Sequence, residues 1–128
     1  MDTKEKAMLA GKFADEKKAL DVSVIELKGL TDIADYFVVV SGTSDRHVKT
    51  IAEHVEKSMK DAGIRPYSTE GYQQGRWVII DYRNVIVHIF LEPLRELYDL
   101  ESLWIEAKRY RIERENTQLG VENGERKA

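Results

Sequence analysis

The stretch RWVIIDYRNVIVHIFL (residues 76–91) decides the fold, because it joins two β-strand patterns through a short polar break. Residues 76–82 and 85–91 are rich in β-branched and aromatic side chains, which is typical of strands. Arg83 and Asn84 lie between them, and Asn tolerates the positive φ that a two-residue hairpin turn requires. The stretch therefore predicts an antiparallel hairpin.

The turn determines which residues face one another across this hairpin. Tyr82 pairs with Val85, and a four-residue loop would keep the same pairs. One face then carries Val78, Ile80, Tyr82, Val85, Val87 and Ile89. The other face carries Trp77 opposite Phe90, Ile79 opposite His88, and Asp81 opposite Ile86. The first face predicts a core, in which each fully buried Val or Ile contributes on the order of 1.5–3 kcal/mol.

The mixed face allows two interpretations. Trp and Phe are normally at least partly buried, so this face can be a second packed layer in which a neighbour satisfies His88. Alternatively, it is an exposed aromatic surface, whose composition is typical of protein interfaces. Two long helices can cover one face of a four- or five-stranded sheet but scarcely both, which favours the exposed surface.

The rest of the chain supplies the elements of an α/β fold. Apolar residues at helical spacing predict a helix over residues 4–20 and another that ends at Gly63, with Ser44 or Thr43 as its N-cap. Residues 21–27 and 36–42 are predicted strands, and residues 64–69 are a predicted edge strand because Pro66 cannot donate to a central ladder. Beyond Pro93 a helix in two pieces is expected. We therefore expect a mixed β-sheet with helices mainly on one face, and a crossover helix between the strands at 36–42 and 64–69.

Composition indicates one globular domain. The chain has 128 residues, of which 42% are hydrophobic and 34% charged. We expect a single domain over residues 1–108 and a polar tail over residues 109–128 that is frayed or disordered. The absence of cysteine, of any run of about 20 apolar residues and of an apolar N-terminal stretch favours a cytoplasmic location.

Net charge bears on the choice of partner. The formal charge is −3 and the pI is about 5.7. A protein that binds nucleic acid mainly through phosphates usually has a basic surplus. Direct nucleic-acid binding is therefore not expected as the main activity, and a basic protein partner suits this chain better.

The candidate chemical motifs are weak. SGTSDR (residues 41–46) is a strand-to-helix turn of the kind that can hold a phosphate, but it lacks the Walker and GxGxxG patterns. No Asp-x-Asp or Asp-x-Glu pair lies in the strands to hold Mg²⁺ for nucleotidyl transfer. His47, His54 and His88 have no metal-site spacing. We predict no enzyme activity, no catalytic residue, no cofactor and no metal. A nucleotidyltransferase-like enzyme that binds nucleotide at the turn of residues 42–44 is the alternative.

Four segments, taken in order, carry a specific resemblance. They are DYFVVVSGTSDRHVKTIAEHVE (35–56), EGYQQGRWVIIDY (70–82), VHIF (87–90) and RELYDLESLW (95–104). Over about residues 5–107 the chain resembles the ribosomal silencing factor family, also called Iojap-like or RsfS. This resemblance implies a nucleotidyltransferase-like fold without catalytic carboxylates. It also implies a protein that binds ribosomal protein L fourteen of the large subunit, blocks docking of the small subunit and represses translation when nutrients are scarce.

The resemblance also implies which residues bind the partner. The family positions fall on Trp77, Asp81, Tyr82, His88, Phe90, Arg95, Tyr98 and Trp104, and Ile79 shares the mixed face. Trp77 and Phe90 are the expected anchors, with Asp81 and Arg95 fixing the register. Trp104 stays open between interface and core, because it lies at helical spacing from Leu100. A homodimer formed through the same aromatic face is a further possibility.

Overall fold

The hairpin at residues 76–91 forms with the predicted register. In the computed structural model, which describes residues 1–113, β4 (Trp77–Asp81) and β5 (Val85–Leu91) pair antiparallel, and Trp77 lies opposite Phe90. The Tyr82 amide donates to the Val85 carbonyl at 2.8 Å, which closes the two-residue turn. Arg83, rather than Asn84, takes the positive φ, at 75°. The carboxylate of Asp81 accepts a hydrogen bond from the Arg83 amide at 2.6 Å and supports this conformation.

The hairpin belongs to a six-stranded mixed sheet with the order β3-β4-β5-β2-β1-β6. The other strands are β1 (Leu20–Glu26), β2 (Tyr36–Gly42), β3 (Ser68–Glu70) and β6 (Lys108–Ile112). β2 and β5 are parallel, and every other neighbouring pair is antiparallel. β3 is an edge strand, as predicted, but it begins at Ser68 rather than at residue 64, so Pro66 lies before it. The crossover helix after β2 therefore returns the chain to the far edge of the sheet, beyond β5 and β4.

The expected boundary between domain and tail is wrong at residues 109–112. These residues belong to β6, which pairs with β1 from Val22 opposite Ile112 to Glu26 opposite Lys108. Tyr110 and Ile112 pack against the core, while Arg109 and Arg111, which alternate with them, are exposed. This alternation was hidden in a strongly charged stretch, because the other three residues of the strand, Lys108, Arg109 and Arg111, are all basic. Residues 114–128, the remainder of the predicted tail, lie outside the described residues.

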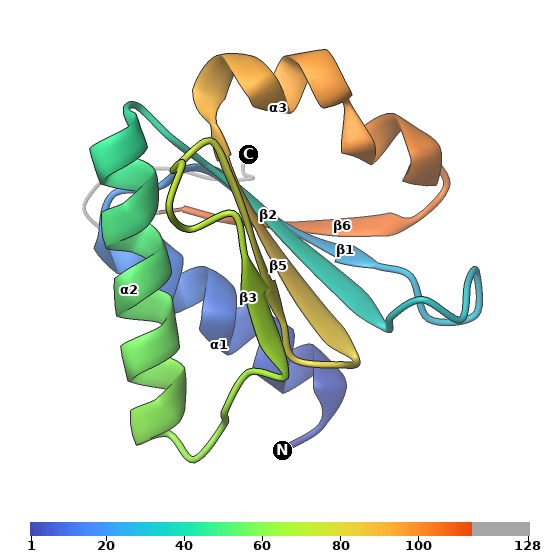
Figure 1. Ribbon diagram of the computed structural model, residues 1–128. Helices are drawn as coiled ribbons and strands as arrows, with labels where there is room; N and C mark the ends of the chain where they lie inside the picture. The colour runs from blue at the N-terminus through green and yellow to red at the C-terminus, as the bar shows by residue number, and fades with distance from the viewer. Residues whose placement is uncertain (114–128) are drawn as a thin grey trace.

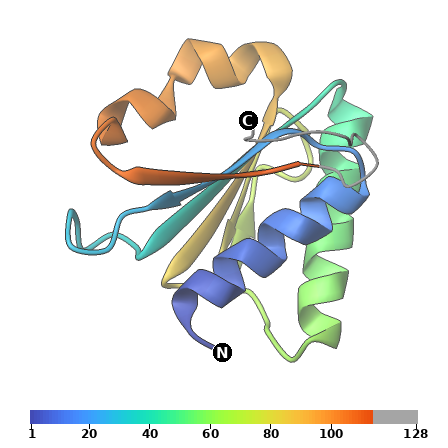
Figure 2. The ribbon, with the colours of Figure 1, turned by 180° about the vertical axis from the view of Figure 1, so that it is seen from behind.

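Two long helices cover one face of the sheet. α1 (Thr3–Glu16) begins with a capping box between Asp2 and Glu5, and α2 (Asp45–Asp61) has Ser44 as its N-cap, one of the two residues predicted for that position. Figure 2 shows both helices on the same side of the strands. The core between these helices and the sheet includes the aliphatic face of the hairpin, as predicted. Its fully buried side chains include Val38, Val55, Val78, Ile80, Val87 and Ile89.

A shorter helical segment lies on the opposite face (Figure 1). It consists of α3 (Glu92–Tyr98) and the 3-10 helix η1 (Leu100–Trp104), with Asp99 between them in the left-handed conformation. The expected helix in two pieces is therefore confirmed. Beneath this segment lies a second, smaller core whose buried members are Ile25, Leu27, Ala34, Phe37, Val39 and Phe90. The second face of the sheet is thus partly covered.

Candidate protein-binding surface

The mixed face of the hairpin is less open than expected. Phe90 is 0% exposed and His88 is 6% exposed, so the prediction that both lie on an accessible surface is wrong. The α3–η1 segment supplies Leu94, Leu100 and Trp104, which pack against the small core around Phe90. The sequence predicted a helix in two pieces after Pro93, but it carried no signal that this short segment folds back over the strands.

Four side chains at the margin of this cover remain accessible. Trp77, Ile79 and Ile86 are half-buried on the strands, and Tyr98, at the end of α3, is 55% exposed. The ring of Tyr98 lies 4.9 Å from that of Trp77, between centroids, so helix and strand meet here. We call these four residues the aromatic surface. They provide large, rigid apolar side chains of the kind that anchor protein interfaces.

The buried rings support the aromatic surface from beneath. Trp77 stacks on Phe90 with centroids 4.8 Å apart and an interplanar angle of 26°. Its indole N–H donates a hydrogen bond to Nδ1 of His88 at 3.2 Å. Because Nδ1 accepts this bond, the neutral tautomer of His88 carries its proton on Nε2. Phe90 and His88 therefore hold the Trp77 ring in place without being accessible themselves.

His88 lies in an apolar environment. The ring of Phe37 contacts it edge-on with centroids 4.6 Å apart, and Nε2 is buried with no hydrogen-bond partner among residues 1–113. Burial lowers the pKa of His88 from its ordinary 6.5 to about 4, since the charged imidazolium would lose its hydration. At neutral pH this histidine is an uncharged packing residue.

Asp81 lies on the expected face of β4 and is half-buried. Its carboxylate accepts from the Arg83 amide, so it stabilises the hairpin turn at one end of the strand pair. Asp81 and Ile86 are directly opposite one another. The structure therefore keeps Asp81 near the aromatic surface, with a local structural contact of its own.

Tyr82 lies on the opposite side of the sheet from the other predicted partner-binding residues of the hairpin. It points toward α1 and α2, is 2% exposed, and belongs to the large core. Successive side chains in extended backbone point to opposite sides, so the residue after Asp81 must face away from the aromatic surface. Burial raises the pKa of the Tyr82 hydroxyl, which has no hydrogen-bond partner in the described part of the chain. The prediction that Tyr82 contacts a partner does not fit this position.

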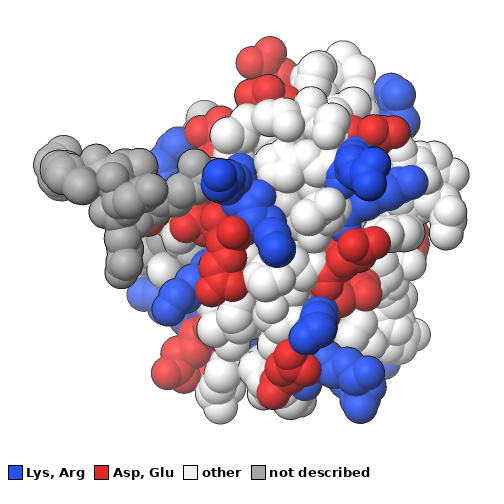
Figure 3. All heavy atoms as spheres, turned by 90° about the vertical axis from the view of Figure 1, so that its left-hand side faces the viewer, with Lys and Arg blue, Asp and Glu red and all other residues white. Residues whose placement is uncertain are grey.

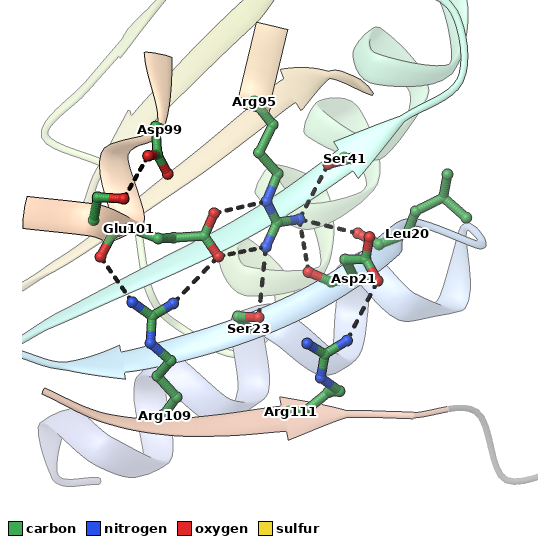
Figure 4. A network of polar contacts seen from close by, with 10 residues as sticks. Leu20, Asp21, Ser23, Ser41, Arg95, Asp99, Glu101, Arg109 and Arg111 are labelled. Atoms are coloured by element: carbon green, nitrogen blue, oxygen red, sulfur yellow. Dashed lines mark hydrogen bonds and ion pairs between the residues drawn. The ribbon is translucent and has the colours of Figure 1, made fainter. Parts of the chain in front are cut away.

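Arg95 also points inward. Figure 4 shows its guanidinium between α3, β1 and β2, where it contacts Glu101, backbone carbonyls and two serine hydroxyls. Its side chain is 11% exposed, so direct contact with a partner is not the role this geometry gives it. Trp104, left open by the sequence, is half-buried and packs on the small core, which favours the core interpretation.

In the candidate phosphate-binding turn, side chains of the turn itself accept hydrogen bonds from its backbone amides. The Ser44 hydroxyl accepts from the His47 amide at 3.0 Å, and the Thr43 amide donates to Nδ1 of His47 at 2.9 Å. A Cβ on Gly42 would lie 2.9 Å from the Val48 side chain, so this glycine permits close packing of strand and helix. These contacts favour the capped-turn interpretation over a nucleotide site.

Several exposed apolar side chains were not singled out from the sequence. They are Leu30 and Ile33 in the β1–β2 loop, and Leu97, Leu103 and Ile105 in or after the α3–η1 segment. Their sequence signal was weak, because Leu30 and Ile33 stand among polar residues in a loop, and the other three lie in or beside elements too short to show a clear period. Within residues 1–113, no three His, Asp or Glu side chains are grouped to hold a metal ion, and no helix has the length and apolar character needed to cross a bilayer.

The fold and the surface together define a class: a small α/β domain with a mixed sheet and a partly covered aromatic face. The family model described as "Ribosomal silencing factor during starvation" matches residues 1–128. The chain belongs to this family, RsfS.

Known relatives agree with this assignment. The ribosomal silencing factor RsfS of Halalkalibacterium halodurans is 39% identical over 113 residues, which cover 88% of this chain and 97% of the relative. A crystal structure of a Chromobacterium violaceum protein superposes with a TM-score of 0.79 at 34% identity, covering 81% of this chain and 87% of that one. A mouse protein named "Mitochondrial assembly of ribosomal large subunit protein 1" is 35% identical over 92 residues, or 70% of this chain and 40% of the mouse protein. The relatives' names describe regulatory and assembly factors rather than enzymes.

Proposed function

We propose that this protein is a translational repressor that acts in the cytoplasm by occlusion. It binds the large ribosomal subunit through ribosomal protein L fourteen, blocks joining of the small subunit and lowers translation under nutrient limitation. The observation that carries the proposal is the aromatic surface, where Tyr98 of the α3–η1 segment meets Trp77 of β4 at the margin of the covered part of the sheet face. No catalytic step is required, because the bound domain itself obstructs the second subunit.

The character of the surface supports a protein partner. Trp and Tyr side chains are enriched among the residues that dominate binding energy, and a rigid stack loses little conformational entropy on binding. The acidic net charge of −3 suits a basic partner. On the side of the molecule where α2 lies, Figure 3 shows acidic and basic side chains interspersed, which does not resemble the continuous basic stripe of a nucleic-acid-binding protein. The mouse relative's name refers to the large ribosomal subunit, which favours that subunit as the partner.

Sedimentation with isolated subunits tests the proposal. The protein is expected to co-sediment with large subunits and not with small ones, and to reduce subunit joining in proportion to its occupancy. Chemical cross-linking of the bound complex should yield a product that contains ribosomal protein L fourteen. Failure to co-sediment, or normal joining at full occupancy, contradicts the proposal.

Two further measurements test the two alternatives, a homodimer and a nucleotide-binding protein. Light scattering with and without large subunits tests whether the aromatic surface also forms a homodimer that the ribosome displaces. Calorimetry with a nucleoside triphosphate and Mg²⁺ tests the nucleotide-binding alternative, and tight specific binding there would restore it.

A further inference from the structure

The α3 helix lacks the buried side chains and the N-terminal cap that usually hold a helix in place. It is seven residues long, has no fully buried side chain and has no side-chain hydrogen bond at its N-cap. Isolated helices of this length are unstable in water. Its position over the sheet must therefore come from particular contacts made by its side chains and by the η1 turn that follows.

Arg95 makes the most extensive of these contacts (Figure 4). Its Nη1 donates to the Asp21 carbonyl at 2.7 Å and to the Ser41 hydroxyl at 3.1 Å, with a longer contact to the Leu20 carbonyl at 3.4 Å. Its Nη2 lies 3.5 Å from the Ser23 hydroxyl. One side chain of α3 thus reaches both β1 and β2, more than fifty residues away in the sequence.

An irregularity in β1 provides the acceptors. The register between β1 and β2 shifts between Leu20 and Ser23, and Asp21 has a left-handed φ of 49°. Such a bulge removes residues from the regular ladder, which leaves their carbonyls available for other donors. Ser23 and Ser41 are buried polar residues on the sheet, and Arg95 supplies hydrogen-bond donors to both. The sheet is therefore built to receive a guanidinium at this point.

Glu101 joins Arg95 to the rest of the cover. Its two carboxylate oxygens accept from Nε and Nη2 of Arg95 at 3.1 and 2.9 Å, the paired geometry of a strong ion pair. Arg109 of β6 approaches the same carboxylate at 3.4 Å and donates to the Glu101 carbonyl at 2.7 Å. The hydrogen bond from Arg95 holds the pKa of Glu101 below its usual range, so the pair stays ionised at neutral pH.

We propose that Arg95 and Glu101 are positioning residues, which hold the α3–η1 segment on the sheet and thereby keep the Tyr98 ring against Trp77. Arg95 then affects partner binding without touching the partner, because a loosened α3 would separate the two halves of the aromatic surface. This inference rests on the proposed function for its consequence in binding. The positioning itself is a property of the free protein.

Hydrogen–deuterium exchange of the free protein tests the positioning. Arg95→Met removes every donor and keeps the aliphatic stem, and Arg65→Met, at an exposed arginine before β3, is the matched control. Amides of α3 and η1 should exchange about tenfold faster in Arg95→Met, while those of α1 and α2 keep the wild-type rate. Unchanged exchange in α3 and η1 overturns the proposal, as does an equal acceleration throughout the chain. If Arg95→Met does not fold, Glu101→Gln serves in its place, with a smaller increase expected in the same two elements.

A double-mutant cycle separates positioning from direct contact. Binding to large subunits is measured for wild type, Arg95→Met, Tyr98→Ala and the double variant, at a temperature where each is folded. Each single change should weaken binding by about tenfold, and the double variant should be hardly weaker than either, since a displaced Tyr98 has no contact left to lose. Multiplicative losses mean that Arg95 acts independently of Tyr98, and they refute the proposal. If the wild type does not bind large subunits, the proposed function fails, and the exchange experiment still decides whether Arg95 positions α3.

Discussion

The indole N–H of Trp77 donates to Nδ1 of His88 across the β4–β5 pair, at 3.2 Å. The two residues are diagonal neighbours, because Trp77 is directly opposite Phe90 and Ile79 is directly opposite His88. A partly accessible ring is thus fixed by a buried imidazole that must be neutral to accept this bond. The most accessible aromatic side chain of the hairpin therefore depends on the protonation of a residue that solvent hardly reaches.

Acidification should destabilise the protein through His88. Burial lowers the pKa of His88 to about 4, whereas the unfolded chain takes up a proton near 6.5. Between these values the unfolded state binds the extra proton, so the free energy of unfolding falls as the pH is lowered from about 6.5 to 4, by up to about 3 kcal/mol. Denaturant titrations at several pH values measure this slope.

His88→Asn isolates the contribution of the histidine. The Asn side chain can still accept from the Trp77 indole, but it does not titrate in this range. Its unfolding free energy should therefore fall less steeply between pH 6.5 and 4 than that of the wild type. Equal slopes in the two proteins would show that other groups cause the acid sensitivity. An NMR titration of the His88 ring should place its midpoint near pH 4.

Trp77→Ala should weaken binding to large subunits by about 2 kcal/mol, roughly 30-fold, if Trp77 anchors the contact. Tyr67→Ala is the control: Tyr67 is 62% exposed and lies under the Arg83 guanidinium before β3, outside the aromatic surface. Its removal should leave the affinity unchanged. Quantitative co-sedimentation measures these affinities. Equal affinities of Trp77→Ala and the wild type would show that Trp77 does not anchor the contact.

Tyr82→Phe should leave binding unchanged and should not reduce stability. The Tyr82 hydroxyl is buried, with no hydrogen-bond partner within residues 1–113, so its removal loses no such bond. Relief of a buried polar group contributes up to about 1 kcal/mol in favour of the variant. Thermal unfolding and co-sedimentation give the two readouts. A weaker affinity at unchanged stability would return Tyr82 to the list of partner-binding residues.

Gly71→Ala should strongly destabilise the protein, because Gly71 lies directly against the backbone of β4 at Trp77. Gly71 has a φ of +81°, and an added Cβ would overlap the carbonyl oxygen of Trp77. Backbone must then move at the start of β4, at an expected cost of about 3 kcal/mol or more. Gly29→Ala provides the comparison, since Gly29 has a φ of +86° but open space around it, and it should cost about 1 kcal/mol. Denaturant unfolding of both variants shows whether crowding or the backbone angle dominates.

The hairpin shows which parts of the fold follow from local sequence. Strand periodicity and the position of the polar break predicted every residue pair between β4 and β5, because a strand has a period of two and a short turn leaves no freedom of register. The same reasoning narrowed the N-cap of α2 to Thr43 or Ser44, and it predicted an edge strand close to the position of β3. Each of these features depends on residues within a few positions of one another.

Burial of the mixed face could not be predicted in this way. The sequence by itself determined that Trp77, Ile79, His88 and Phe90 share one face, but it did not determine which of them solvent can reach. That was decided by the α3–η1 segment, whose position depends on Arg95 meeting the β1 bulge some seventy-five positions earlier. Only the folded chain brings these groups together, because a guanidinium and backbone carbonyls so far apart leave no periodic pattern in the sequence. The sequence predicted an exposed aromatic face. In the folded protein, part of this face is buried beneath the α3–η1 segment, and only the aromatic surface at its margin is accessible.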